Sequence, residues 1–346
     1  MTIGLSKKTF FITGTMALAI VLVFSTSLGA ASITPADSLR VILSAIPGIG
    51  NYVDTSHVSQ AHQSIILYIR LPRILLAFLV GYGLSVVGTA MQGMLKNPMA
   101  DPFIIGTSSG AALGAAIAIV LKFNQSVLGF GAVSMTAFVG ALLSTSIVYR
   151  LASLKNRVPV TGLLLAGVAT GQFFNAILSF IMVMASQDVS SIVYWTMGSF
   201  SSRGWQHVGL IVIPVFAGSI ILMTYAKELN LLLLGEDTAS NTGVEVDRVK
   251  RIILVVSSLL TAFVVSVSGI IGFVGLIIPH VTRMLTGPDH RFLIPAAGLT
   301  GGIFLVLTDT FSRTVIAPTE LPVGILTALA GAPFFIYLLR QTKKIR

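Results

Sequence analysis

The 346-residue sequence contains no cysteine, which excludes a disulfide and a thiolate-ligated metal site. Charged residues are also scarce, because Asp, Glu, Lys and Arg make up 10% of the chain, whereas a soluble domain carries about 25%. No Gly-Lys pair occurs anywhere, so the phosphate-binding pattern Gly-x-x-x-x-Gly-Lys-Ser/Thr is absent. Any ATP-driven activity of this chain therefore requires a separate ATPase.

Apolar residues make up 54% of the sequence and gather into runs of helix length. As helices, runs of roughly twenty residues span the hydrocarbon core, and helices satisfy their own backbone in lipid. We therefore predict an all-α polytopic membrane protein, with residues 1–346 forming a single transmembrane domain. Ten crossings are expected, at residues 10–30, 65–93, 103–121, 128–149, 160–184, 206–226, 250–268, 270–285, 292–310 and 322–340.

The formal net charge of +10 lies at the ends of these segments, which indicates membrane orientation rather than a nucleic-acid partner. Sixteen of the 22 Lys and Arg residues fall on one side, and both termini are predicted to share that cytoplasmic side. Gly29-Ala30-Ala31-Ser32 could mimic a signal-peptidase site, but the preceding run exceeds a usual signal segment, so we expect residues 10–30 to remain as the first helix. Residues 31–64 then form an extracellular loop, and residues 65–340 form the core.

Two crossings are predicted to end in backbone breaks. Pro98 and Pro102 lack N–H donors and bias the preceding Asn97 and Asp101 away from helix. A second break is expected after residue 268, where several glycines precede Pro279. In the predicted topology the two stretches run in opposite directions, which is typical of the inverted repeats of transporters.

From Arg70 onward the chain resembles the permease subunit of type II ABC importers, the iron-chelate and cobalamin uptake family. Two positions depart from the family pattern: Met99 stands where leucine is common, and Ile270 stands where proline is common. The matching blocks, in order, are Arg70-Leu-Pro-Arg73, Gly83-Leu-Ser-Val-Val-Gly88, Met91-Gln-Gly93, Asn97-Pro-Met-Ala-Asp-Pro102, Gly235-Glu236, Gly243-Val244, Gly272-Phe-Val-Gly-Leu276, Pro279-His280, Asp289-His-Arg291, Glu320-Leu-Pro-Val-Gly324 and Gly331-Ala-Pro-Phe334.

The resemblance implies a permease in the bacterial cytoplasmic membrane that works as a homodimer or as a heterodimer with a paralogue. Its other implied partners are two cytoplasmic ATPase subunits, which hold ATP and Mg, and an extracellular or periplasmic substrate-binding protein. This chain would hold no cofactor and catalyse no reaction. The implied task is import of a large metal chelate, with an Fe(III)-siderophore placed ahead of cobalamin or haem by family frequency alone.

The resemblance also implies roles for particular residues. Arg70, Arg73 and Arg313 at outer segment ends would form exposed ion pairs with glutamates of the binding protein, although interfacial snorkelling is an alternative. The loop 227–250 holds four consecutive leucines that water solvates poorly, and the resemblance makes it two short helices docked in the ATPase. The implied coupling residues are Leu233, Leu234, Gly235, Glu236, Asp237 and Gly243, and the implied cytoplasmic gate is Asn97, Met99, Val160 and Thr161.

Polar side chains in the fifth predicted crossing leave two interpretations open. Gln172 and Asn175 either form hydrogen bonds between helices or line a passage for the chelate.

Two rival functions fit the residues less well. An ion-coupled carrier normally buries carboxylates near the membrane midplane, but only Asp309 lies in a predicted crossing, near its outer end. We expect Asp309 to pair with Arg313 four residues later. A membrane-embedded enzyme is disfavoured because no nucleophile–base pattern appears and the five histidines show no metal-ligand spacing. We therefore predict neither a catalytic nor a metal site.

Overall fold

Helices account for almost all of the described structure. The computed structural model describes residues 7–123, 126–127, 130–153 and 159–344. Seven segments in these ranges are long and apolar enough to cross a membrane: α1 (Lys7–Ser27), the stretch Gln60–Met94, α6 (Ala132–Ala152), α7 (Val160–Met184), α9 (Trp205–Thr224), α12 (Val246–Ser268) and α14 (His290–Thr314). Three shorter apolar helices are α5 (Thr107–Val120), α13 (Val274–Thr286) and α15 (Val323–Lys344). Together they match the ten predicted crossings, which confirms the all-α polytopic fold.

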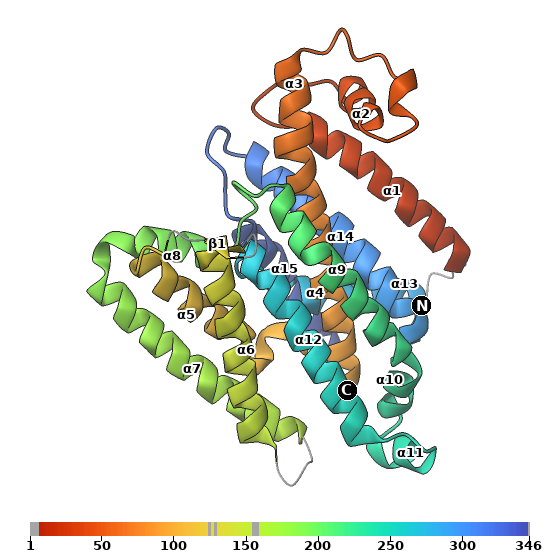
Figure 1. The fold of residues 1–346 in the computed structure, drawn as a ribbon. Helices are drawn as coiled ribbons and strands as arrows, with labels where there is room; N and C mark the ends of the chain where they lie inside the picture. Colours follow the sequence, from red (N-terminus) through yellow and green to blue (C-terminus); the bar gives the residue numbers. More distant parts are fainter. Residues whose placement is uncertain (1–6, 124–125, 128–129, 154–158, 345–346) are drawn as a thin grey trace.

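The two ends of the molecule carry different small elements (Figure 1). At one end, called the outer end here, lie α2 (Pro35–Ser44), a 3-10 turn (Gly50–Tyr52) and α3 (Gln60–Ser64). At the opposite, inner end lie α10 (Ala226–Leu233) and α11 (Glu236–Asn241). α1 begins beside the inner end of α14, because Lys7 Nζ lies 5.6 Å from the ring centroid of Phe292. This placement agrees with the predicted side for the start of the chain.

Two helices, α4 (Leu71–Met94) and α12, occupy the centre of the bundle. α9 and α14 pack on α4, and α1 packs on α14. On the other side, α6 packs on α12, and α5 and α7 pack on α6 (Figure 1). Most of α4 is consequently buried by its neighbours, which explains why its sequence is apolar on every face.

The crossings expected at 103–121 and 270–285 are shorter than predicted. α5 has 14 residues and α13 has 13, so at 1.5 Å per residue each is about 20 Å long and falls short of the ~30 Å hydrocarbon core. The chain leaves α4 at Met94 and passes through a 3-10 helix (Pro102–Ile105) before α5 begins. It leaves α12 at Ser268 and resumes helix only at Val274. Both backbone breaks predicted from the sequence are confirmed.

The second break forms even though Ile270 replaces the common proline. Gly269 has φ +71°, and its N–H donates to Val265 O to close α12. A Cβ atom at Gly269 would lie 2.3 Å from Trp195 O, so this position tolerates only glycine. The positive φ of Gly269, which packs against the backbone at Trp195, therefore ends α12 without a proline at position 270.

The 3-10 helix that precedes α5 lies against the start of α13 inside the bundle. Gly275, in the first turn of α13, lies against Pro102, and a Cβ atom at Gly88 of α4 would lie 1.8 Å from Gly275 O. The packing of α14 on α4 repeats that of α6 on α12. The stretches from α4 to α6 and from α12 to α14 run in opposite directions and pack on each other in corresponding pairs, which forms the inverted repeat that the sequence predicts.

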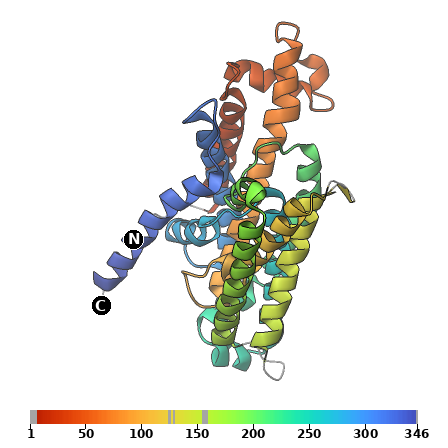
Figure 2. The ribbon, with the colours of Figure 1, turned by 90° about the vertical axis from the view of Figure 1, so that its left-hand side faces the viewer.

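Two connecting segments and the last helix differ from expectation. Strands β1 (Ser126–Val127) and β2 (Phe130–Gly131) pair antiparallel, and β2 lies where helix was predicted from residue 128. A 3-10 turn (Ser186–Asp188) and the short α8 (Val189–Thr196) follow α7, in a region expected to be loop. α15 packs mainly on α14 and α13, and its second half projects away from the bundle (Figure 2).

Candidate functional site

The outer site begins with a wide helical turn that ends at Arg70 and leads directly into the first turn of α4, which carries Arg73. Residues Ile65–Arg70 form a π-helical turn that runs without interruption into α4. Leu71 N–H donates to Ile66 O, and the carbonyl of Leu67 instead accepts a hydrogen bond from Trp205 Nε1 at 2.8 Å. Single π-helical turns of this kind are frequent at functional sites. The turn allows the helix to continue through Pro72 and places Arg70 and Arg73 on adjacent turns.

Arg70 holds the end of α1. Its Nη1 donates to Thr26 O and Ser27 O at 2.8 Å each, and its Nη2 donates to Ala31 O at 2.8 Å. The last carbonyls of a helix have no partner within the helix, so a buried guanidinium satisfies them well. Arg70 is 5% exposed, and it contributes to the anchoring of the first helix.

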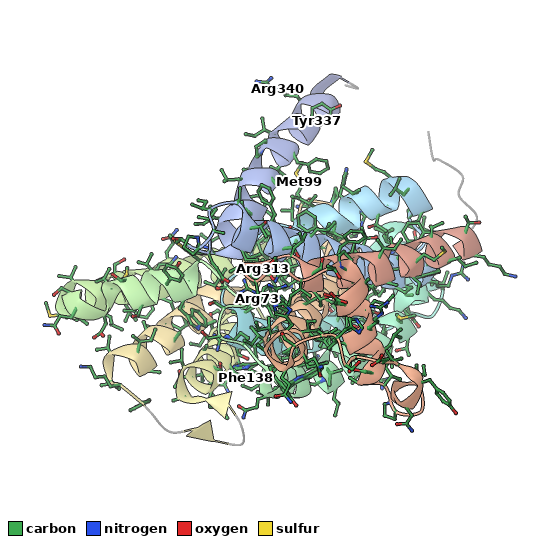
Figure 3. The ribbon with its side chains drawn as sticks, turned by 90° about the horizontal axis from the view of Figure 1, so that it is seen from above. Arg73, Met99, Phe138, Arg313, Tyr337 and Arg340 are labelled. Carbon is green, nitrogen blue, oxygen red and sulfur yellow. The ribbon has the colours of Figure 1, made fainter. Side chains whose placement is uncertain are left out.

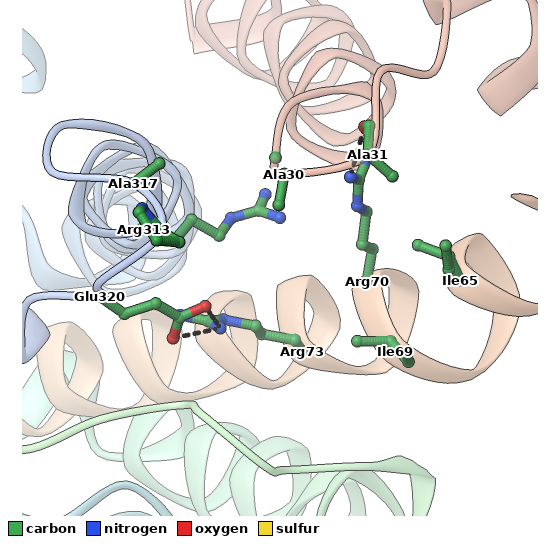
Figure 4. Close-up of a pocket in the computed structure, with 11 residues that line it drawn as sticks. Ala30, Ala31, Ile65, Ile69, Arg70, Arg73, Arg313, Ala317 and Glu320 are labelled. Atoms are coloured by element: carbon green, nitrogen blue, oxygen red, sulfur yellow. Dashed lines mark hydrogen bonds and ion pairs between the residues drawn. The ribbon is translucent and has the colours of Figure 1, made fainter.

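Arg73 forms the centre of a buried ion-pair network. Its Nε and Nη2 donate to the Asp309 carboxylate, with the shortest N–O distance 2.8 Å, and its Nη1 donates to both Glu320 oxygens at 2.9 Å. Asp309 is fully buried, whereas the Glu320 side chain is 36% exposed. Figure 4 shows Glu320 reaching Arg73 from the chain segment that precedes α15.

Arg313 completes the network one turn beyond Asp309. Its Nε lies 3.8 Å from Asp309 Oδ2, so the predicted pairing is present, but Arg73 is the closer partner. Its Nη2 donates to the Ser25 carbonyl of α1, whereas its Nε is buried without a hydrogen-bond partner. In Figure 4 the guanidinium points toward Ala30.

The three arginines are buried, so the expectation of exposed ion pairs at these positions is wrong. Packing of α14 along α4 brings Asp309 to Arg73 across 236 positions of sequence, and no local pattern reveals that contact. Buried ion pairs with good geometry and further hydrogen bonds resist solvent screening, unlike exposed ones. The role of these arginines toward an external partner is a separate question, taken up below.

An open pocket of about 280 Å³ lies over this network. The two arginines and two carboxylates of the network balance in charge, and Arg70, which lines the same pocket and bonds only backbone carbonyls, adds one surplus positive charge. Seen from the outer end, Arg73 and Arg313 lie near the middle of the molecule (Figure 3). A surplus cation at an open pocket favours an anionic group. The lining residues are Gly29, Ala30, Ala31, Ile65, Ile69, Arg70, Arg73, Arg313, Ala317, Pro318 and Glu320.

At the inner end, the loop 227–250 contains the two short helices that the resemblance implies, α10 and α11. Leu232 is buried in the core, so the four leucines do not act as one surface. Leu233 and Leu234 are 43% and 69% exposed and form a small apolar patch beside the turn at Gly235. Exposed paired leucines at a loop tip are typical of a contact surface.

Ion pairs and a glycine cap hold α10 and α11 in place. Glu236 lies 2.7 Å from Lys250 of α12 and 3.7 Å from Lys96, which follows α4. Partial burial alone would raise the pKa of Glu236, but the hydrogen bond and charge of Lys250 outweigh it and lower the pKa. Gly243, at φ +89°, closes α11 as predicted, whereas Asp237 faces solvent.

The predicted gate and passage residues lie on two segments that meet in the bundle. Asn97 Oδ1 accepts from Met99 N at 2.9 Å and shapes the break after α4. Val160 and Thr161 open α7, and Gly167 of the same helix packs against Ile104. Gln172 and Asn175 are both exposed on α7. They therefore form no buried contact between helices within this chain.

In the part of the chain that the structure describes, no group of three or more His, Asp or Glu side chains is arranged to hold a metal ion. The charged networks described above hold helix ends together instead.

The chain is similar in sequence to known transport permeases. A model of the FecCD transport family matches residues 17–341. The chain is 48% identical over 284 residues to the cobalamin import system permease protein BtuC of Halobacterium salinarum, covering 82% of this chain and 75% of that one. It is 34% identical to the iron(3+)-hydroxamate import system permease protein FhuG of Bacillus subtilis, covering 97% and 98%. Further relatives are named as permeases for hemin and for Fe(3+)-citrate.

A solved structure has the same fold. It is described as an inward-facing metal-chelate type ABC transporter, and it matches with a TM-score of 0.82 and 32% identity over 97% of this chain and 100% of that one. The resemblance noted from the sequence blocks is thus confirmed over nearly the whole chain. This chain is a multi-pass protein of the cytoplasmic membrane and belongs to the FecCD transport family, the permeases of ABC importers for metal chelates.

Proposed function

We propose that this chain forms the passage through which a separate ATPase drives inward movement of a large metal chelate. The observation that carries the proposal is the exposed pair Leu233 and Leu234, which lies at the turn between α10 and α11 at the inner end. A chain without a phosphate-binding loop needs a contact surface of this kind, through which a separate ATPase can move it. Two ATPase subunits, each holding ATP and Mg, fit a permease that is itself a dimer.

A second permease copy, or a paralogue, is the proposed partner within the membrane. Only 17% of the most apolar stretch of α7 is buried in this chain, against 83% for Gln60–Met94. The exposed α7 face includes Gln172 and Asn175, and polar amides are costly against lipid. A partner copy would cover the apolar part of the face and leave these amides along a wet passage. Asn97, Met99, Val160 and Thr161 are then the proposed gate at its inner end.

At the outer end, the proposed partner is a substrate-binding protein that inserts a carboxylate into the pocket over Arg70, Arg73 and Arg313. Glu320 already occupies one side of Arg73 and remains partly exposed, so an incoming glutamate would have to displace it or share the guanidinium with it. Asp309 is buried below and would stay in place. Glu320 would therefore weaken docking in the free permease.

Replacing Glu320 by Gln is accordingly expected to increase the affinity of the cognate binding protein several-fold, because the competing charge is removed while Asp309 still holds Arg73. The measurement is the dissociation constant on permease in nanodiscs at two salt concentrations, with steeper salt dependence in the variant. Asp54→Asn is the matched control, since Asp54 is an exposed acid of the outer loop away from the pocket. An affinity that falls in Glu320→Gln would contradict docking at this pocket.

The cargo is proposed to be an Fe(III)-siderophore, with cobalamin as the second candidate because the relative at 48% identity is named for cobalamin. Proteoliposomes with permease, ATPase and binding protein should accumulate one of them only when ATP is enclosed with the ATPase. Uptake of ⁵⁵Fe-siderophore and of ⁵⁷Co-cobalamin, measured in parallel, decides between them. Accumulation driven by an ion gradient without ATPase would favour the ion-coupled alternative instead.

A further inference from the structure

One amide side chain joins the short inner helix α10 to the start of α14. Asn230 Oδ1 accepts from the His290 backbone N–H at 2.9 Å and lies 2.8 Å from His290 Nδ1. Its Nδ2 donates to Asp289 Oδ1 at 2.7 Å. A single side chain thus makes three polar contacts with two consecutive residues of a neighbouring segment, which fixes its position closely.

The two residues that Asn230 contacts, Asp289 and His290, are themselves held in place at the start of α14. Asp289 caps α14 by accepting from Arg291 N at 3.1 Å, and it also binds the Arg291 guanidinium. The hydrogen bonds from Arg291, and then the one from Asn230, hold the pKa of Asp289 well below its usual range. His290 is fully buried and packs on Gly93, where a Cβ atom would lie 2.5 Å from its Nε2. The start of α14 therefore has little freedom to move independently of Asn230.

The opposite end of the same helix carries the outer network. α14 is a continuous helix of 25 residues, which corresponds to about 37 Å at 1.5 Å per residue. Asn230 accepts a hydrogen bond from His290, the first residue of α14. In the last two turns of α14, Asp309 binds Arg73 and Arg313 donates to the Ser25 carbonyl of α1.

The helix α14 contains Pro295, which removes one backbone hydrogen bond near its inner end. It is packed on α4 on both sides of this proline, through His290 at Gly93 and through Gly298 and Gly301, so its two ends shift together.

We propose that Asn230 is a positioning residue that fastens the loop 227–250 to α14, so that displacement of the loop and displacement of the outer network occur together. The inference rests on the proposed function, in which ATPase subunits move this loop and a binding protein docks on the outer network. It adds a specific joint, at Asn230 with Asp289 and His290, through which docking outside would influence ATP hydrolysis inside.

The test measures how strongly the binding protein stimulates ATP hydrolysis by the complete complex of permease and ATPase in nanodiscs. Asn230→Asp places a second carboxylate 2.7 Å from Asp289 and removes the donated hydrogen bond. The stimulation ratio is expected to fall to less than a third of the wild-type ratio. In the double variant Asn230→Asp with Asp289→Asn, the new amide at position 289 donates to the new carboxylate and turns its oxygen toward the Arg291 guanidinium. The capping bond from Arg291 N is lost, but the acceptor toward His290 is kept, so the ratio is expected to recover to within about two-fold of wild type.

Asn241→Asp is the matched control, because it makes the same chemical change at the exposed end of α11 in the same loop, and its ratio should remain near wild type. A purely structural role would lower basal and stimulated hydrolysis in proportion and leave the ratio unchanged, which would overturn the proposal. Failure of the double variant to restore the ratio would overturn it as well. Binding of the ATPase and of the binding protein is measured separately on each variant, so that loss of the proposed function itself is recognised by lost binding.

Discussion

Replacing both Leu233 and Leu234 by Asp is expected to abolish ATP-driven uptake while leaving the permease folded. Both side chains are largely exposed in this chain, so the core loses little. Each leucine buried in a partner's cleft contributes about 1.5–3 kcal/mol, and two introduced carboxylates would add a desolvation cost. The affinity for the ATPase should therefore fall by about 100-fold or more. Co-purification and direct titration of the ATPase subunit measure the effect.

The matched control places the same substitutions at the other end of the molecule. Leu28 and Leu39 are 47% and 42% exposed near the outer end, so Leu28→Asp with Leu39→Asp makes the same chemical change away from the loop. That variant should bind the ATPase normally. Leu232→Asp should instead unfold the inner end, because Leu232 is fully buried. Undiminished ATPase binding by the Leu233 and Leu234 variant would remove the main support for the proposed function.

The second large effect is expected at Asp309. Asp309→Asn leaves Arg73 and Arg313 buried with one carboxylate fewer between them. Breaking one partner of a buried ion pair typically costs 3–5 kcal/mol, so a loss of about that size in the free energy of unfolding is expected. The variant should show a lower apparent melting temperature in detergent and easier release of α1, which Arg313 holds through Ser25.

Glu320→Gln is the matched comparison, because Glu320 binds the same guanidinium but lies partly in solvent. Its effect on stability should be about 1 kcal/mol or less, as for an exposed ion pair. Equal destabilisation by both substitutions would show that burial does not set the energetics of this network.

Several features of the fold could be read from local sequence. Runs of apolar residues located all ten membrane segments, because helix length and lipid thickness are linked by simple geometry. Pro98, Pro102 and Gly269 located the two breaks, since proline lacks a donor and glycine alone accepts the backbone angles there. Gly243 located the end of α11 for the same reason. Each of these signals acts within a few residues of itself.

The candidate sites were harder to predict. Arg70, Arg73 and Arg313 were identified as important, and the pairing of Asp309 with Arg313 was predicted. Their burial and the partners of Arg73 were not predicted, because Asp309 and Glu320 reach Arg73 from more than 230 positions away. Asn230 was missed entirely. The signal for it was the block Asp289-His290-Arg291, but nothing in the sequence indicates which segment such a block contacts.

The amino-acid sequence by itself determined the class of protein, its membrane segments, the places where helices stop, and the absence of the phosphate-binding motif Gly-x-x-x-x-Gly-Lys-Ser/Thr. Only the tertiary structure decided that the outer arginines are buried in a shared network, that two of four leucines are exposed, and that Asn230 joins the loop to α14. The physical reason is range: backbone preferences and hydrophobic periodicity are local, whereas burial and ion pairing depend on which distant helices pack side by side.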